Sequence, residues 1–231
     1  MISAICLRGF SLFAIGHFAL GYLVGKSSGK FGKVKLNLPL LFAASVLPDI
    51  DLLLRFLMHR GPTHSLLAIT AFMIPFFIIY RKQAIPYYAA MLSHIFLGDY
   101  FTGGIELFWP VSQGWFGALN FDVTSLPSAS VELALFILTI PIMFKLGDLQ
   151  VFLKPHNKNW ALIIPFGATL VPLLSLSRGA ENTLPVLLAV PSLFYIILFA
   201  CSLLIWLGAG LKTIKKTNPN NKPLISNVSI T

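Results

Sequence analysis

The chain has 231 residues, of which 56% are hydrophobic and only 11% charged, and its formal net charge is +9. Soluble domains carry about 25% charged residues, so this composition excludes an ordinary soluble domain and indicates a membrane protein. About 20 apolar residues cross a bilayer as a helix. We therefore expect an all-α fold, a polytopic membrane bundle of about seven transmembrane helices. Residues 1–211 would form a single integral-membrane domain, and residues 212–231 a polar, disordered tail.

Taken in chain order, the apolar stretches predict helices over 9–25, 36–54, 64–80, 84–101, 128–146, 160–177 and 184–211. The first stretch lacks a short apolar core followed by a small-residue cleavage site, so we expect a retained helix rather than a signal peptide. Residues 102–127 are rich in glycine and aromatic side chains, which is typical of an interfacial or re-entrant loop. Pro191 predicts a tilt or kink in the last helix.

Basic residues gather in alternate loops of this scheme. Loops 26–35, 81–83 and 145–159 and the tail together hold thirteen, whereas the opposite side holds Arg8, Arg60 and Arg178. The basic side should be cytoplasmic, which predicts a multi-pass cell-membrane protein with its N-terminus outside and its C-terminus in the cytoplasm. A re-entrant path for 49–63 would place two lysine-bearing loops outside, and we disfavour it. Nucleic-acid binding is excluded because no basic stripe carries interleaved aromatic residues.

Residues 47–64, LPDIDLLLRFLMHRGPTH, concentrate polar side chains within an apolar sequence. These are Asp49, Asp51, Arg55, His59, Arg60 and His64. Ionised groups at membrane depth cost several kcal/mol unless they are paired, hydrated or bound to a metal. Gly61-Pro62 predicts a turn that lets the two histidines reach one centre. Asp49 and Asp51 are two positions apart and do not share a helical face, so one would bind the metal and the other support it, unless a break at Pro48 lets both converge. Two other interpretations stay open: carboxylates paired with the arginines, or histidines that merely lie at the interface.

Three further candidate ligands lie on other predicted helices. His94 and Asp99 are five positions apart, about 140° around an ideal helix. They converge only if the helix unwinds at Gly98, or else they bind different ions. His17 lies near the middle of the first helix, where a lone histidine is equally typical of a hydrogen-bonded core residue. His156 falls in a predicted cytoplasmic loop, and we exclude it.

Imidazole and carboxylate groups together are a common ligand set for Zn²⁺ and other divalent metals. The candidate ligands are His17, Asp49, Asp51, His59, His64, His94 and Asp99. They outnumber the four positions of one tetrahedral ion, so one or two ions are expected. A bound ion activates water for hydrolysis. Asp51 and Arg60 are the candidate catalytic residues, and Thr63 and Thr102 are candidate hydrogen-bonding partners around the site.

The segments LPDID, HRGPTHS and LSHIFLGDYFTGGIELFWP resemble the three signature blocks of the YdjM-like family, over about residues 10–115. These are LexA-regulated inner-membrane proteins, also labelled membrane-bound metal-dependent hydrolases. The resemblance implies the same ligands, with His17 matching an N-terminal histidine. A distant link of the family to the zinc phospholipase C and nuclease P1 group implies a phosphoester substrate. One departure is the spacing of His94 and Asp99. The corresponding pair in the family more usually reads His-x-x-x-Asp, whereas here four residues separate the two, which puts the role of Asp99 in question.

The expected partners are membrane lipid and a small-molecule or lipid substrate, such as a phospholipid or an isoprenoid phosphate whose headgroup lies at the level of the site. The main alternative is a non-catalytic metal-binding membrane protein or a transporter. An intramembrane aspartyl protease is disfavoured, because Phe96 stands where a Gly-x-Gly-Asp motif ending at Asp99 requires its first glycine.

Overall fold

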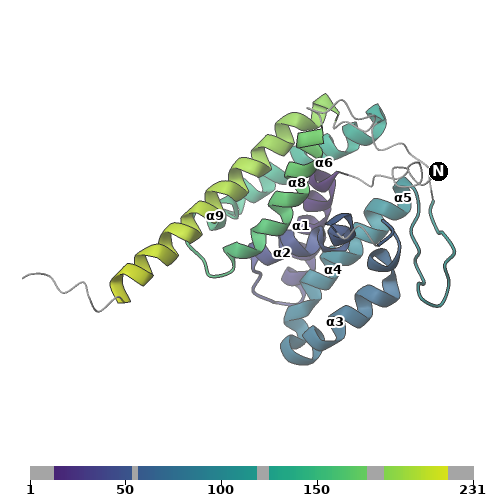
Figure 1. Ribbon diagram of the computed structural model, residues 1–231, viewed down its shortest axis with the longest axis horizontal. Helices are drawn as coiled ribbons and strands as arrows, with labels where there is room; N and C mark the ends of the chain where they lie inside the picture. The colour runs from purple at the N-terminus through teal and green to yellow at the C-terminus, as the bar shows by residue number, and fades with distance from the viewer. Residues whose placement is uncertain (1–12, 54–56, 119–124, 176–184, 218–231) are drawn as a thin grey trace, which may run out of the picture.

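The computed structural model describes residues 13–53, 57–118, 125–175 and 185–217, and these residues are helical with irregular connections (Figure 1). The main helices are α1 (Ala14–Phe31), α2 (Leu38–Ser45), α3 (Leu66–Tyr80), α4 (Ile85–Ser93), α6 (Leu126–Lys145), α8 (Ile163–Ser175) and α9 (Ala189–Thr217). The short elements are η1 (Leu47–Leu53), η2 (Pro62–His64), η3 (Arg81–Ala84), η4 (His94–Asp99), α5 (Tyr100–Thr102), α7 (Leu149–Phe152), η5 (Asn159–Leu162) and η7 (Val186–Leu188). The expected all-α class is confirmed for this part of the chain.

Some expectations lie outside the described residues. They are the start of the first helix at 9–12, the tail from 218 onward, and Arg8, Arg55 and Arg178. Of the loop expected over 102–127, residues 102–118 and 125–127 are described. Residues 103–118 contain no helix, whereas Thr102 ends α5 and α6 already begins at Leu126.

The expected single helix over 36–54 is wrong. The side chain of Asn37 caps α2 by accepting the N–H of Leu40 at 3.1 Å, and α2 then ends at Ser45. Pro48 has no N–H to continue the α-helical ladder. The chain instead runs on as the 3₁₀-helix η1, which carries Asp49 and Asp51. This break is what turns the carboxylates away from the axis of α2.

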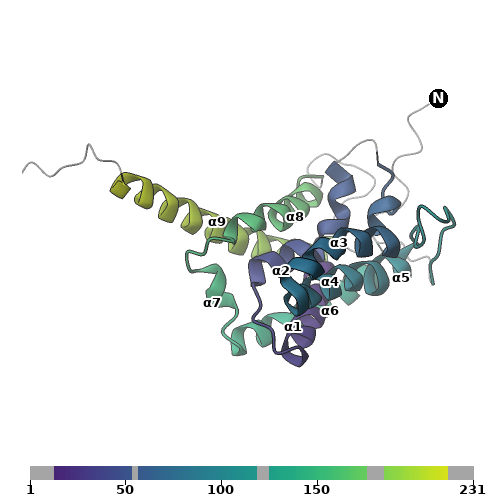
Figure 2. The same cartoon turned by 90° about the horizontal axis from the view of Figure 1, so that it is seen from below.

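Helices α3 and α4 form an antiparallel hairpin and lie side by side in Figures 1 and 2. The chain reverses at Arg81, whose φ of 52° ends α3. The Thr70 hydroxyl lies 2.8 Å from the Tyr88 hydroxyl, and the Phe77 ring meets the Tyr88 ring edge-on. At 15 residues α3 is about 22 Å long, shorter than the ~30 Å hydrocarbon layer of a bilayer.

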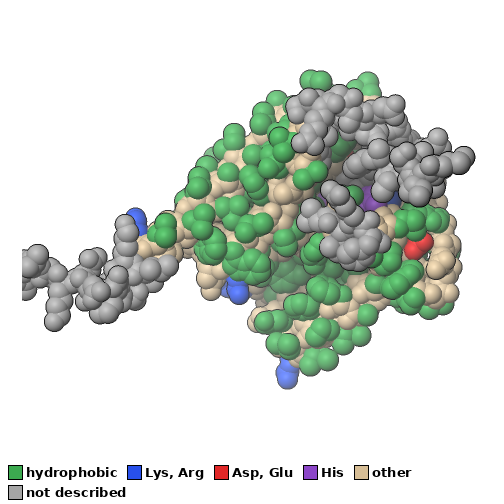
Figure 3. All heavy atoms as spheres, in the orientation of Figure 1, with side chains coloured by type: hydrophobic (Ala, Val, Ile, Leu, Met, Phe, Trp, Pro, Cys, Tyr) green, Lys and Arg blue, Asp and Glu red, His purple; other side chains and the backbone are tan. Residues whose placement is uncertain are grey.

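Three stretches of the described chain are long and apolar enough to cross a membrane: Leu66–Thr102, Leu126–Lys145 and Val186–Lys212. The first of them contains the α3–α4 hairpin. The number of seven crossings therefore stays a prediction. Hydrophobic side chains are spread over the whole described face in Figure 3, whereas histidine and acidic atoms each show at one small place. Such a surface fits a membrane location, since water would not solvate it.

An aromatic cluster joins the N-terminal helices to α9. Phe18 of α1 and Phe42 of α2 pack with Tyr195 and Phe199 of α9, at ring-centroid distances from 5.0 to 6.0 Å. All four side chains are buried. Helix α9 therefore packs against α1, which carries His17, and against α2, which leads to Asp49.

Three of the predicted basic loops meet at one end of the bundle. Lys26, the first residue of the loop expected over 26–35, lies within α1, which continues to Phe31. It forms an ion pair with Asp148, which also accepts a hydrogen bond from the Tyr22 hydroxyl at 2.6 Å. Gly25 packs against the backbone of Pro86, beside the α3–α4 turn. A common side for these loops agrees with the predicted topology, while the orientation of the termini stays a prediction.

Candidate metal centre

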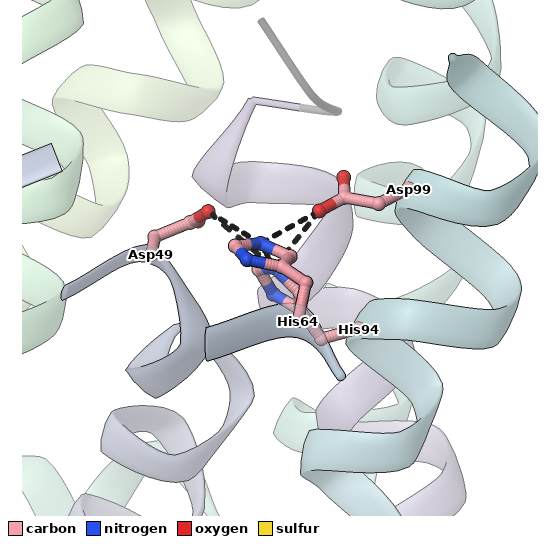
Figure 4. A group of neighbouring side chains, drawn as sticks. All are labelled: Asp49, His64, His94 and Asp99. Atoms are coloured by element: carbon pink, nitrogen blue, oxygen red, sulfur yellow. Dashed lines mark hydrogen bonds and ion pairs between the residues drawn. The ribbon is translucent and has the colours of Figure 1, made fainter. Parts of the chain in front are cut away.

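Four candidate ligands meet at one place, and three separate elements supply them (Figure 4). Asp49 comes from η1, His64 from η2, and His94 and Asp99 from η4. The two imidazole rings lie together in the middle, and the two carboxylates approach from opposite sides. His64, His94 and Asp99 are fully buried. The arrangement is a compact group of two nitrogen and two oxygen donors inside an apolar protein.

Five of the six distances between the four donor atoms are close to those around a tetrahedral ion, and all four atoms lie within 4.8 Å of one another. His64 Nε2 lies 3.4 Å from Asp49 Oδ1, 2.9 Å from Asp99 Oδ2 and 3.2 Å from His94 Nε2. His94 Nε2 lies 3.4 Å from Asp49 Oδ1 and 3.3 Å from Asp99 Oδ2. Ligand atoms of a regular tetrahedron with zinc bonds of ~2.0–2.1 Å are about 3.3–3.4 Å apart. The side chains therefore fit one small divalent cation with little rearrangement.

A π-helical turn brings His94 and Asp99 to the same face. Residues His94–Asp99 form the π-helix η4, in which hydrogen bonds run from i to i+5. Residues five apart then lie one above the other, rather than about 140° apart as on an α-helix. The helix widens instead of unwinding at Gly98, so the spacing His-x-x-x-x-Asp is compatible with a shared ion.

Hydrogen bonds on the far side of each imidazole leave its Nε2 free for an ion. His94 Nδ1–H donates to the backbone carbonyl of Ser45 at 2.8 Å. His64 Nδ1 lies 3.3 Å from Asp51 Oδ2 and 3.0 Å from the Thr63 hydroxyl. Histidines that ligate metals usually donate their other N–H to a carboxylate or carbonyl, which fixes the ring orientation and the tautomer. Both histidines follow this pattern.

Asp51 organises the turn that carries His64 and does not belong to the four-donor group. Its Oδ2 accepts the backbone N–H of Arg60 at 3.2 Å and the Thr63 hydroxyl at 2.8 Å, and its Oδ1 lies 3.1 Å from His59 Nδ1. These contacts satisfy most of the acceptor capacity of a carboxylate. Asp51, His59 and His64 form a second group close enough to hold an ion, which shares His64 with the first group.

Arg60 lies beside the centre with its side chain buried. Its Nη2 donates to Thr102 Oγ1 at 3.0 Å and lies 3.7 Å from Asp99 Oδ1. The guanidinium occupies the space where Gly103 has no side chain, because a Cβ there would collide with Nη1. Arg60 therefore holds the outward oxygen of Asp99, while the other oxygen faces the two histidines.

His17 is close to the centre without joining the four-donor group. Its ring stacks on that of His94 at a centroid distance of 3.7 Å, and its Nε2 is 3.8 Å from Asp99 Oδ1. Neither ring nitrogen has a hydrogen-bond partner among the described residues. The predicted ligands thus divide into three sets. Four meet at one point, Asp51 and His59 form a second group with His64, and His17 stacks on His94. Whether they bind a metal stays a prediction.

The charges of the group favour a divalent cation. Among the described residues, the ion pairs of Asp49, Asp51 and Asp99 involve four histidines and one arginine, Arg60. If the histidines are neutral, two negative charges are left unbalanced in a buried place, which is costly. No hydrogen bond reaches Asp49 Oδ1 or either Asp99 carboxylate oxygen from the described residues. These oxygens face the histidine nitrogens as ligands around an ion do.

Asp51 of η1 and His64 of η2 are among the groups that lie outside the three candidate spans. Burial lowers the pKa of His64, but its contacts with Asp49, Asp51 and Asp99 outweigh this and raise the pKa well above its ordinary value. Burial raises the pKa of Asp51, but the hydrogen bonds of His59 and His64 outweigh this and hold the pKa well below its ordinary value.

Glu132 was overlooked by the sequence reasoning. This fully buried residue of α6 reaches the start of α1, where its two oxygens accept the backbone N–H groups of Phe13 at 2.8 Å and Gly16 at 3.2 Å. It thereby replaces an N-cap for the helix that carries His17. The sequence feature that could have identified Glu132 is that it is a single acidic residue within an apolar helix.

Comparison with known proteins extends the resemblance beyond the signature blocks. A family model described as YdjM inner membrane protein matches residues 13–204, which include most of α9. No curated protein and no solved structure matches the chain. The match covers most of the sequence, and it includes all four residues of the donor group. The chain therefore belongs to the YdjM inner membrane protein family.

Proposed function

We propose that this protein is a membrane-embedded, metal-dependent hydrolase that cleaves a phosphoester bond. The observation that carries the proposal is the group of Asp49, His64, His94 and Asp99, whose donor atoms all lie within 4.8 Å of one another inside an apolar protein. Two imidazoles and two carboxylates are a ligand set that suits Zn²⁺. A bound ion of this kind supplies an activated water and polarises the oxygen under attack.

The surrounding residues would orient the ligands and bind the substrate. Ser45 and Asp51 hold His94 and His64 through their Nδ1 atoms. Arg60 has a guanidinium that lies beside the centre, and its Nε has no hydrogen-bond partner among the described residues. A guanidinium pairs well with phosphoryl oxygens, so Arg60 would stabilise the negative charge that develops there.

The experiment compares the metal content and activity of the purified full-length protein with those of His64→Ala and Asp49→Ala variants. His156→Ala is the matched control, since His156 is exposed and belongs to neither group. We expect about one ion per chain in the wild type and the control, and loss of the ion and of phosphoester hydrolysis in both ligand variants.

Two results would contradict the proposal at different levels. Equal and low metal content in wild type and ligand variants would remove the metal centre altogether. A bound metal that depends on His64 and Asp49, without hydrolysis of any phosphoester in a panel of mono- and diesters, would leave a non-catalytic metal protein or a transporter.

A further inference from the structure

An apolar groove runs beside the centre, between η1 and η2 on one side and α3 on the other. Its volume is about 320 Å³, near the lower end of the ~300–1,000 Å³ range of ligand pockets. Pro48 and Ile50 of η1 face Ala68 and Phe72 of α3 across it, and Trp109 completes the lining. The exposed side chains of α3, which forms one wall of the groove, are mostly hydrocarbon.

The groove and the centre share their walls. A 3₁₀-helix has three residues per turn, so successive side chains point about 120° apart. Asp49 turns towards the histidines, while its neighbours Pro48 and Ile50 line the groove. In the same way Thr63 lines the groove, and the next residue, His64, supplies a donor to the centre.

Almost no polar group faces into the groove. Thr63 is the one residue with a side-chain hydroxyl in its lining, and this hydroxyl already donates to Asp51 at 2.8 Å. The Trp109 carbonyl accepts the Ser65 hydroxyl at 2.7 Å, which fixes the loop at the start of α3. An apolar cavity holds water poorly, and in a bilayer the available apolar occupant is a hydrocarbon chain.

We propose that the groove binds one hydrocarbon chain of a lipid phosphate, so that the phosphate headgroup of the same molecule reaches the centre at Asp49 and His64. This inference rests on the proposed function and names its substrate class. A chain held beside η1 and a phosphate held beside Arg60 use two adjoining surfaces of the same short elements. The protein thereby selects long-chain phosphoesters from the membrane over water-soluble ones.

Photocrosslinking tests the groove without requiring turnover. The full-length protein is reconstituted in vesicles with phosphatidic acid that carries a photoreactive acyl chain, and the labelled residues are mapped by mass spectrometry. We expect labelling to concentrate on the walls over 47–50, 62–63 and 68–72. The same acyl chain on diacylglycerol, which has no phosphate, should label these walls about tenfold less, equivalent to ~1.4 kcal/mol of headgroup binding.

Two pairs of variants separate the groove from the general lipid-facing surface. Ala68→Trp and Ile50→Trp fill the groove from opposite walls, and each should lower the labelling about tenfold. Ala71→Trp and Leu52→Trp are the matched controls, because both residues are exposed on the same elements outside the lining. The controls should label like the wild type, and the unfolding midpoints of all four variants identify any that fail to fold.

Uniform labelling along α3, labelling unchanged in both groove variants, or equal labelling by the diacylglycerol probe would each overturn the inference. These outcomes are distinct from failure of the hydrolase. An inactive protein whose groove labels as expected would still bind lipid phosphate there. An active, metal-loaded protein with uniform labelling would be a hydrolase with another means of substrate selection.

Discussion

His94 Nε2 and Asp99 Oδ2 lie 3.3 Å apart although five positions separate the two residues, because the turn between them is π-helical. A π-turn of this kind commonly accommodates one extra residue and is frequent at functional sites. The pair can therefore share an ion without the spacing of four that an α-helix needs.

Deleting Leu97 should convert the π-turn into an α-helical turn and keep the centre. Leu97 is 46% exposed, and its removal leaves the histidine and the aspartate four apart on one helical face. We expect metal content within about twofold of the wild type. Leu92 lies in the regular α-helix α4, which has no extra residue. Deleting it rotates His94 by about 100° around the helix axis and should abolish metal binding. Equal loss in both deletions would contradict this account of η4.

Asp51→Asn should weaken metal binding without abolishing it. The amide lacks the charge that holds His64 Nδ1–H, and the loss of such an outer partner typically costs about 10–100-fold in metal affinity. Competition with a chelator measures this change. His64→Ala, which removes a donor of the four-atom group, should be more severe. If Asp51→Asn binds metal as poorly as His64→Ala, Asp51 is itself a ligand.

Gly103→Ala should displace the Arg60 guanidinium, because a Cβ at residue 103 collides with Nη1. We expect kcat on a phosphoester to fall about 100-fold, as when a positioned donor to the developing charge is removed, while metal content is retained. Gly208→Ala is the control, because a Cβ there meets nothing within 4 Å. Unchanged kcat in Gly103→Ala would show that Arg60 has no part in catalysis.

Glu132→Gln should destabilise the protein by about 1–3 kcal/mol. A glutamine offers one acceptor oxygen, whereas both oxygens of Glu132 accept backbone N–H groups at the start of α1. The amide nitrogen of the glutamine then faces one of these N–H groups in place of an acceptor oxygen. The free energy of unfolding in detergent titrations measures the effect. An unchanged value would mean that the start of α1 finds another acceptor.

Metal affinity should rise with pH through the neutral range. The carboxylates around His64 raise its pKa well above the ordinary value, so the proton on its imidazole competes with the ion. If one proton is released for each ion bound, affinity rises about tenfold per pH unit below that pKa and levels off above it. Isothermal titration in buffers of different ionisation enthalpy counts the protons released. A pH-independent affinity from pH 6 to 8 would contradict this competition.

The residue types of the centre could be predicted from the sequence, but their roles could not. Histidines and carboxylates in an apolar sequence are expensive, so Asp49, His64, His94 and Asp99 stand out by composition alone. The spacing of Asp49 and Asp51 predicts that one carboxylate binds the ion and the other supports it, and Pro48 marks the break in the helix. Which of the two faces the histidines depends on the 3₁₀-helix that follows Ser45. The convergence of His94 and Asp99 depends on a π-turn, for which side-chain periodicity provides no signal.

Contacts between distant parts of the chain were beyond sequence reasoning for a different reason. The Ser45 carbonyl that orients His94 is a backbone group, and every residue has one. Glu132 acts 116 positions away from Gly16, and a pairing at that separation depends on the packing of α6 against α1. Counting apolar stretches also gives too many assignable membrane crossings. The stretch 36–54 was counted as one crossing, but its α-helix, α2, is only eight residues long.

Helix α1 is held at both ends by residues made much later. Glu132 binds its first turn, and Asp148 binds Tyr22 and Lys26 near its other end. During synthesis, the segments that carry Asp49, His64, His94 and Asp99 leave the ribosome before either anchor exists. The placement of α1 beside the centre is therefore completed late in membrane insertion, and a chain truncated before residue 132 would carry all four donors without the contacts that hold the helix of His17 at both ends.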